Sequence, residues 1–455
     1  MKQTLIVTAV AVTLALGSAR GNDAILDLLI KKGVITQREA NEVREQADQQ
    51  MAQTVEAYNK GKYSSWLDNV KLSGDLRLRA ENFSFEDYRN TTDRLRFRYR
   101  LRLGMEYNYH DWAKLTVRLG SGNNEPAAAI DTGDPVSTNA TMTDTFRKKS
   151  LYVDAVYVTL QPPGWNWVKV LAGKMDTPVW QPKFNSPMVY DFDVTPEGVA
   201  EQLEYVFGDK QQYRLFGLFG QYALKEISGN SRDPFMVDLQ GGIEAKFGGN
   251  EKNPKLKTTL AGGYYFTHNL ENGSYTMTDS PNLGNANGSG AKSNNWLSGF
   301  SVAYGRGEVA YNITDKPFLG TPALLTLSGE VDKNLNGDYE HLPDNQTLGW
   351  TVQLAFGDTK KKGQWQIAYQ YKHLEADAVW DAITDSDWGV GGTDREGHVI
   401  KGAYCVTDWW QFACTAFFSE KISNRPNTGH NTVGAIGAYH GQDLLRLQVD
   451  SVFKF

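Results

Sequence analysis

Five arginines spaced two residues apart are the side chains in this sequence that are best placed to do chemistry. They alternate with large apolar residues over a single short segment. The two sets are Arg94, Arg96, Arg98, Arg100 and Arg102, and Leu95, Phe97, Tyr99, Leu101 and Leu103. A helix would spread these arginines around its circumference, whereas a strand places every second side chain on one face. The spacing therefore predicts a strand with one cationic face, which would attract anions.

Three further arginines follow the same pattern in neighbouring segments, namely Arg77, Arg79 and Arg118. A proline-containing loop, residues 175–197, carries candidate counter-charges, namely Asp176, Asp191, Asp193 and Glu197. If this loop folds toward the arginines, the two sets create a constriction whose transverse field orients dipolar solutes. A plainer interpretation is that the arginines are solvated and pair with Asp75, Glu81 and Glu106. The sequence leaves both interpretations open.

Other chemical motifs are weak. Cys405 and Cys414 flank a turn with no zinc or redox spacing, so free thiols are favoured over a strained cross-hairpin disulfide. The segment from Asp332 to Gly337 matches half of a calcium loop, but Pro343 stands where a glutamate is required, which favours an external loop. The chain has no HExxH, GxSxG or Walker motif. We expect no catalytic residues, no metal and no cofactor.

Period-two alternation recurs along the chain from residue 69 and predicts sixteen strands. They begin near residues 69, 94, 113, 150, 167, 198, 213, 235, 255, 295, 322, 346, 364, 396, 410 and 443. The orientation of the segments 150–160 and 198–207 cannot be assigned, because each is apolar on parts of both faces. The connections between strands alternate between short turns and long loops, notably 121–149, 176–197, 267–294, 375–395 and 421–442. Short turns on one side and long loops on the other are typical of transmembrane barrels.

Aromatic residues gather at the short-turn ends, as in Trp112, Trp165 and Trp409, where an interfacial girdle belongs. A charged side chain facing lipid costs about 2–4 kcal/mol at the midplane, so the arginines must face a lumen. Sixteen strands enclose a bore too wide for side chains alone to fill. The sequence therefore predicts an all-β transmembrane protein, an antiparallel barrel of about sixteen strands preceded by a short N-terminal helix. A soluble two-sheet sandwich is the alternative, since its strands would also alternate.

The first residues differ from the barrel segment. Lys2, an apolar run from Thr4 to Leu16 and the small residues Gly17–Ala19 predict a signal peptide over residues 1–19. Residues 20–62 predict a periplasmic helical segment, in which Thr36 and Glu39 form a capping box. Its narrow apolar stripe suits either a solvated helix without a partner or a short coiled coil between subunits. The barrel is expected over residues 69–455.

Bulk composition excludes two classes of protein. Hydrophobic residues make up 40% of the chain and the mean hydropathy is −0.48, which is too polar for a helical membrane protein. The net charge of −6 argues against a nucleic-acid partner.

Several segments together resemble a family of bacterial outer-membrane porins that begin with a short helical periplasmic segment. These segments are residues 28–36 with Glu39–Ala40, Arg94–Gly104, Ala172–Met175, Asp193–Gly198, Trp365–Tyr371, Glu375–Val379, Asp385–Asp387, and Arg446–Asp450 with the terminal Phe455. The likeness spans nearly the whole mature chain. It implies an outer-membrane barrel that is oligomeric, with a trimer expected, and it implies no particular substrate.

We expect passive diffusion of small hydrophilic solutes or ions through a water-filled barrel in the bacterial outer membrane, with a leaning toward anions. The expected partners are outer-membrane lipid, these solutes and further copies of the chain. A substrate-selective channel is the first alternative. The second is a structural protein that the N-terminal helix tethers to the cell wall. The sequence does not separate the first two.

Overall fold

A computed structural model of the chain describes residues 26–45, 67–85, 93–122, 133–143, 145–146, 148–229, 231–249, 253–270, 299–336, 346–389, 391–422 and 443–455. The chain divides into two compact units, Met1–Val70 and Lys71–Phe455. The proposed signal peptide and residues 46–62 of the proposed helical segment lie outside the described residues. No described helix is long and apolar enough to cross a membrane.

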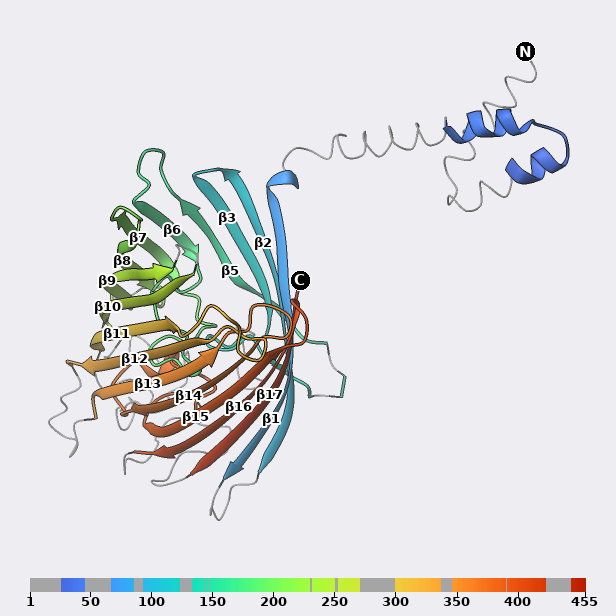
Figure 1. Ribbon diagram of the computed structural model, residues 1–455. Helices are drawn as coiled ribbons and strands as arrows, with labels where there is room; N and C mark the ends of the chain where they lie inside the picture. The colour runs from blue at the N-terminus through green and yellow to red at the C-terminus, as the bar shows by residue number, and fades with distance from the viewer. Residues whose placement is uncertain are drawn as a thin grey trace. The chain divides into compact units, whose positions relative to one another are not determined.

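The second unit is a closed antiparallel β-barrel (Figure 1). Its strands are β1 (Val70–Phe85), β2 (Arg94–His110), β3 (Ala113–Ser121), β4 (Ala140–Thr141), β5 (Leu151–Leu160), β6 (Val168–Lys174), β7 (Glu197–Phe207), β8 (Tyr213–Ala223), β9 (Phe235–Gly249), β10 (Pro254–His268), β11 (Ser301–Asn312), β12 (Leu324–Asn334), β13 (Leu348–Gly357), β14 (Trp365–Leu374), β15 (Arg395–Cys405), β16 (Trp410–Lys421) and β17 (Leu444–Lys454). The described residues also include the 3₁₀ turns η1 (Leu67–Asn69) and η3 (Asp381–Ile383). Pairing of β1 with both β17 and β2 closes the ring, so no strand edge is left exposed to lipid.

The predicted fold class is confirmed, since β4 is a two-residue strand beside β2 and the other sixteen strands form the barrel wall. One start was wrong, because β11 begins at Ser301 rather than near residue 295. The ambiguous orientation of β5 has a physical reason. Arg118 of β3 pairs with Ala155 while Leu119 pairs with Val153, so Asp154 is the extra residue of a bulge. The bulge moves the alternation from one face to the other.

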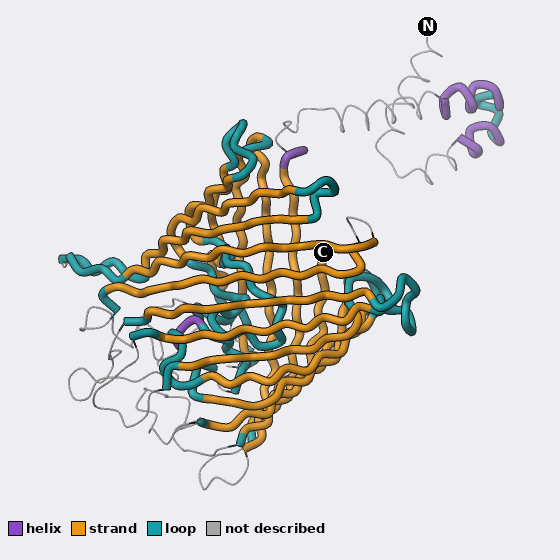
Figure 2. The backbone as a smooth tube through the Cα atoms, turned by 60° about the vertical axis from the view of Figure 1, so that its left-hand side comes forward, coloured by secondary structure: helices purple, strands orange, loops and turns teal. Residues whose placement is uncertain are grey.

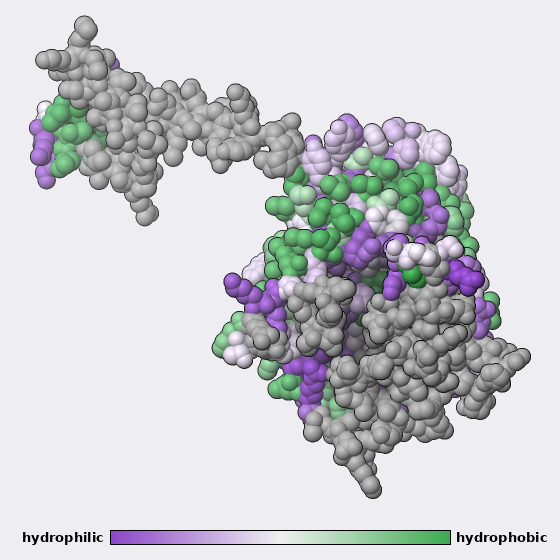
Figure 3. All heavy atoms as spheres, turned by 180° about the vertical axis from the view of Figure 1, so that it is seen from behind, coloured by the Kyte–Doolittle hydropathy of each residue, from purple (hydrophilic) through white to green (hydrophobic). Residues whose placement is uncertain are grey.

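The two faces of the wall have opposite character. Outward positions carry exposed apolar side chains such as Leu260, Leu327 and Ile400, and Figure 3 shows hydrophobic side chains gathered on the barrel surface. The lumenal positions alternate with them and carry the charged and amide side chains. At the short-turn end, aromatic rings pack on each other, as in Trp165 with Trp167 and Trp409 with Phe453. The outer surface is therefore built for lipid.

Three connections enter the barrel instead of remaining outside it, namely residues 133–143, 175–196 and 375–394, and Figure 2 shows loop segments inside the ring of strands. The second and third pack on the inner wall in one apolar core. Its members include Met188, Val189, Tyr190, Val379, Trp380 and Ile383 from the loops and Leu218, Tyr265, Val302 and Tyr304 from the wall. This core fills the side of the lumen next to β8–β11.

The external position expected for loop 375–395 is wrong. Ala376, Ala378, Val379 and Trp388 within it are buried, because their apolar surface is covered only inside the barrel. The proposed external loop at Asp332 is also wrong in part, since Asp332 and Asn334 are buried residues of β12. No group of residues suited to hold a metal ion occurs among the described residues. Cys405 and Cys414 are free thiols, as predicted.

The described part of the N-terminal unit is helical over residues 26–31 and 37–45. The capping box forms as predicted, because the backbone N–H of Thr36 donates to Glu39 Oε2 at 2.7 Å and that of Glu39 donates to Thr36 Oγ1 at 3.3 Å. Leu26, Ala40 and Val43 are buried against Ile30 and Ile35. The narrow apolar stripe is thus buried between the two helices of this unit.

Candidate functional site

The loop 175–196 is held across the lumen by glutamine side chains of the wall. Gln240 on β9 accepts from the backbone N–H of Trp180 and donates to its carbonyl, both at 2.8 Å. Gln370 on β14 does the same with Ser186, at 2.9 and 2.7 Å. Gln353 on β13 accepts from Asn185 at 2.7 Å and donates to Lys183 at 3.0 Å. Each amide therefore replaces the hydrogen bonds that a neighbouring strand would supply.

The far end of this loop meets the arginine wall. Asp193 accepts from Arg100 at 3.4 Å and from Arg102 at 3.3 Å, and both arginines also bind Asp75 of β1. Burial alone would raise the pKa of the Asp193 carboxyl, but the positive charges of Arg100, Arg102 and Arg77 outweigh it and hold the pKa below its ordinary value. Asp193 therefore stays ionised and links the loop to the opposite wall.

Loop 375–394 forms a second ionic contact with the same wall. Asp387 accepts from Arg79 at 2.8 Å and from Arg446 of β17 at 2.8 Å. Arg446 also donates to the Ser386 and Asp387 carbonyls, at 2.9 and 2.8 Å, and to Glu81. Burial would raise the pKa of the Asp387 carboxyl, but Arg79 and Arg446 hold it well below its ordinary value. Both inward loops are thus fastened to the wall by carboxylates.

A cavity of about 200 Å³ remains between these loops and the wall formed by β1, β2 and β15–β17. Its basic lining residues are Arg77, Arg79, Arg100, Arg102 and Lys401, and its acidic ones are Asp191, Asp193, Asp385, Asp387 and Asp450. Opposite charges thus line a narrow space inside a wide barrel. Such an arrangement produces a field across any solute that passes.

The structure brings some of the predicted partners together and separates others. Arg118 pairs with Asp176 at 2.6 Å and with Asp154, and Arg96 pairs with Glu81. Arg98 donates to the Asn139 carbonyl at 3.2 Å. Arg94 is exposed at the start of β2. The interpretation in which wall carboxylates pair with the arginines thus holds for Asp75 and Glu81. The interpretation in which the loop meets the arginines holds for Asp193.

Three predicted carboxylates lie away from the arginines. Asp191 accepts from the backbone N–H of Ser386 at 2.9 Å and of Asp193 at 2.8 Å, because its side chain turns toward the other inward loop. Burial and the neighbouring carboxylates of Asp193 and Asp385 raise its pKa well above the ordinary value. Glu197 pairs with Lys174 at 3.1 Å, and Glu106 pairs with Lys114 at 3.4 Å.

Sequence reasoning missed the partners supplied by distant segments. Asp450 binds Arg79 through both oxygens, at 2.7 and 2.9 Å, although 371 residues separate them. Lys401, Asn139 and the three loop-binding glutamines were also missed as site residues. Asp450 and the glutamines could have been found from their place in the period-two pattern. They stand on the polar, lumenal face of their strands.

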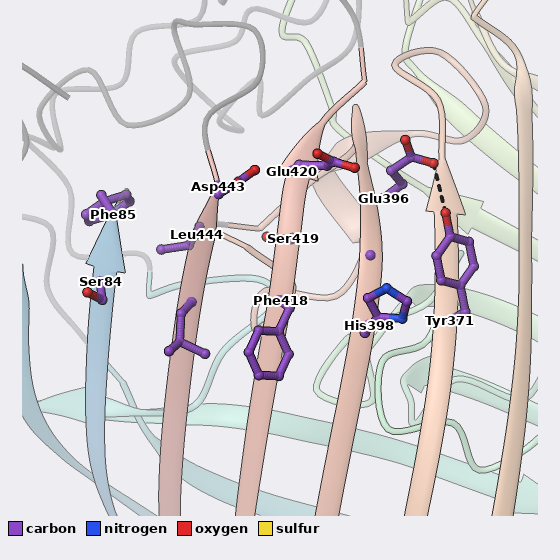
Figure 4. A pocket seen from close by; sticks show the side chains of 12 residues that line it. Ser84, Phe85, Tyr371, Glu396, His398, Phe418, Ser419, Glu420, Asp443 and Leu444 are labelled. Carbon is purple, nitrogen blue, oxygen red and sulfur yellow. Dashed lines mark hydrogen bonds between the residues drawn. The ribbon is translucent and has the colours of Figure 1, made fainter. Parts of the chain in front are cut away.

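A second depression, of about 550 Å³, lies at the long-loop end of β14–β17 (Figure 4). There Tyr371 donates to Glu396 at 3.0 Å, and His398 and Phe418 stand beside them. Tyr371 alternates with the lumenal Gln370 and Lys372, so this depression opens on the outer face and is separate from the lumen.

Comparison with known proteins identifies the family. Residues 87–289 and 302–433 match the family model described as "Putative porin", which covers more than half of the chain. The chain belongs to this porin family. It is therefore an outer-membrane channel with a porin-type barrel. No curated protein matches this porin in sequence.

Solved structures of outer-membrane proteins are similar to this porin, and the likeness to OprB supports the fold. OprB of Pseudomonas putida, in its high-pH structure, is 11% identical with a TM-score of 0.51 over 87% of this porin and 97% of that chain. OmpT of Vibrio cholerae, in a trimer form, is 13% identical with a TM-score of 0.45 over 85% of this porin and 100% of that chain. A mutant porin of Rh. blastica is 9% identical with a TM-score of 0.42 over 85% and 100%.

Replacement of Gln370 by leucine tests whether the glutamine contacts hold the loop inside the barrel. The variant leaves the Ser186 N–H and carbonyl unpaired, at a cost of about 2 kcal/mol. We expect trypsin to cleave after Lys183 at least about tenfold faster than in the wild type, because a loosened loop leaves the lumen more often.

The control is Gln366→Leu on the same strand, which removes only a 3.4 Å hydrogen bond to Gly357. The cleavage rate is measured by mass spectrometry of the released peptides in detergent solution. Equal rates in both variants and the wild type would contradict the role of Gln370.

Proposed function

We propose that this porin lets small hydrophilic solutes and ions diffuse passively through a water-filled path, with a leaning toward anions, and that it catalyses no reaction. The observation that carries the proposal is the pairing of Asp193 with Arg100 and Arg102, which joins an inward loop to the basic wall. In the proposal this contact narrows the path to a charged constriction, and the cavity of about 200 Å³ beside it is part of that path.

The anion leaning follows from the balance of charge along the wall. Eight arginines were predicted to face the lumen, and seven of them contact lumenal or loop groups in the structure. These are Arg77, Arg79, Arg96, Arg98, Arg100, Arg102 and Arg118. Arg77 and Arg98 bind neutral Asn139 groups instead of carboxylates. Their positive charge therefore remains to attract anions that enter the lumen.

Conductance in planar lipid bilayers tests the proposal. The purified porin should give stepwise open-channel currents. In a KCl gradient the reversal potential should lie closer to the equilibrium potential of chloride than to that of potassium. Asp193→Asn should raise the chloride-to-potassium permeability ratio at least about twofold, because the charges of Arg100 and Arg102 lose a counter-charge.

The matched control is Glu197→Gln, at the start of β7 just after the same loop, where the carboxylate pairs with Lys174 and not with the arginine wall. It should leave the ratio unchanged. The absence of any conductance, or potassium selectivity that D193N does not alter, would refute the proposed function.

We further propose that the porin works as a homo-oligomer, with a trimer expected. Glu201 of β7 lies beside the lumenal, fully buried Ala200, so its side chain faces outward, where Gln221 donates to it at 3.4 Å. A carboxylate exposed to lipid is destabilising, although less so than an arginine or a lysine at the same depth. Another copy of the chain would cover it at lower cost.

The mass of the detergent-solubilised porin, corrected for bound detergent, tests this arrangement. The wild type and Glu201→Gln should have the mass of three chains, whereas Glu201→Arg should dissociate the assembly, because its charge and bulk disrupt the contact. A monomeric wild type contradicts the proposal.

We propose that the N-terminal unit lies in the periplasm. β1 begins at the end of the barrel where β17 finishes, because Asp75 pairs with Lys454. The short turns lie at that end, and in outer-membrane barrels short turns face the periplasm. Loops such as residues 224–234 would then face outward from the cell.

Thiol labelling of whole cells measures this orientation. Arg38, whose side chain is 91% exposed in the N-terminal unit, and exposed Ser228 in the loop after β8 are each changed to cysteine. A membrane-impermeant maleimide should label Ser228→Cys in intact cells but Arg38→Cys only after the outer membrane is permeabilised. Labelling of both in intact cells refutes the orientation, and the unaltered chain gives the background from Cys405 and Cys414.

A further inference from the structure

Two basic side chains in the cavity of about 200 Å³ form no ion pair with any carboxylate that the structure describes. Arg77 donates one hydrogen bond, from Nη2 to Asn139 Oδ1 at 2.7 Å, and its Nε is buried with no hydrogen-bond partner among the described residues. Lys401 on β15 lines the same cavity, and no ion pair or hydrogen bond joins its amine to any part of the chain that the structure describes. The buried Arg77 Nε without a partner is costly and calls for a ligand or water.

The carboxylates that line the cavity are already bound to other groups. Asp450 holds Arg79 through both of its oxygens. Asp387 accepts from Arg79 and Arg446, and Asp193 accepts from Arg100 and Arg102. Asp191 and Asp385 also line the cavity, but they accept from backbone N–H groups, and burial raises the pKa of both carboxyls. Arg77 and Lys401 are therefore left as donors for an anion that comes from outside the chain.

Most of the lining is polar, and three phenylalanine rings and a proline supply its apolar part. Phe184, Phe192 and Phe417 line the cavity together with Pro187, and Thr415 adds a hydroxyl on the Lys401 side of the wall. An inorganic anion gains nothing from these rings, whereas an organic anion with an apolar body buries that body against them. At about 200 Å³ the space suits a small solute.

We propose that Arg77 and Lys401 form a saturable binding site for small organic carboxylates that carry an apolar body. The carboxylate receives charge-assisted hydrogen bonds from the Arg77 guanidinium and the Lys401 amine. The apolar body lies against the phenylalanine rings. This inference rests on the proposed channel function, and it adds a substrate class and a binding step to what would otherwise be free diffusion.

Benzoate is the probe, and the measurement is its effect on the KCl current of single channels. Benzoate should reduce the chloride current with a saturating concentration dependence. Acetate and inorganic phosphate share the negative oxygens but lack the apolar body, and benzamide has the ring without the charge. Each should need at least about tenfold more solute for half-maximal reduction, since each loses one of the two sets of contacts.

Arg77→Gln and Lys401→Gln should each raise the half-maximal benzoate concentration about tenfold. Lys257→Gln is the matched control, because it also removes one positive charge from the barrel interior, where Lys257 pairs with Glu244 at 3.1 Å, but outside the cavity. It should keep the wild-type benzoate response. Lys401→Gln breaks no contact within the described chain, so it carries the test even if Arg77→Gln fails to fold.

The outcomes separate this inference from the proposed function. A current that falls in proportion to benzoate without saturation overturns the site while conductance stands. The proposed site is also overturned if R77Q and K401Q both keep the wild-type benzoate response. It is overturned as well if acetate or phosphate reduces the current as strongly as benzoate. A chain with no KCl conductance refutes the channel itself.

Discussion

A loop that enters the lumen of a β-barrel must satisfy its backbone hydrogen bonds without a neighbouring strand. The porin meets this constraint with Gln240, Gln353 and Gln370, whose amides bind both donors and acceptors of loop 175–196. An amide suits the task because it donates and accepts at once and carries no charge that needs neutralising. The position of the loop, and with it the narrow cavity, depends on these contacts.

The inward loops divide the barrel into two unlike halves. On the side of β8–β11 the loops and wall share one apolar core, which includes Tyr190, Tyr265 and Trp380. On the side of β1, β2 and β15–β17 the same loops present Asp193 and Asp387 to arginines. The apolar half supplies the free energy that keeps the loops inside, and the ionic half fixes where their ends lie. The solute path that we propose therefore follows the basic wall and not the barrel axis.

The barrel itself could be predicted from the sequence because period-two alternation is local, as it is from Arg94 to Tyr109. The bulge at Asp154 explains why the face of β5 could not be assigned. Partners within the lumen could not be predicted, since the contact of Arg79 with Asp450 joins residues 371 positions apart. Of the loop carboxylates, Asp193 meets Arg100 and Arg102 and Asp176 meets Arg118, while Asp191 turns to Ser386. Composition alone does not reveal such choices, which depend on how two loops pack together.

The central claim is that pinned loops reduce a wide sixteen-stranded bore to a small charged passage. Exclusion of neutral polymers measures this directly, because a polymer that enters the channel lowers its single-channel conductance. With polyethylene glycols of increasing size, the account predicts that only the smallest lower the conductance and that Gln370→Leu admits larger ones. If polymers as wide as an unobstructed sixteen-stranded barrel lower the conductance of the wild type, the loops do not define the pore and the account is contradicted.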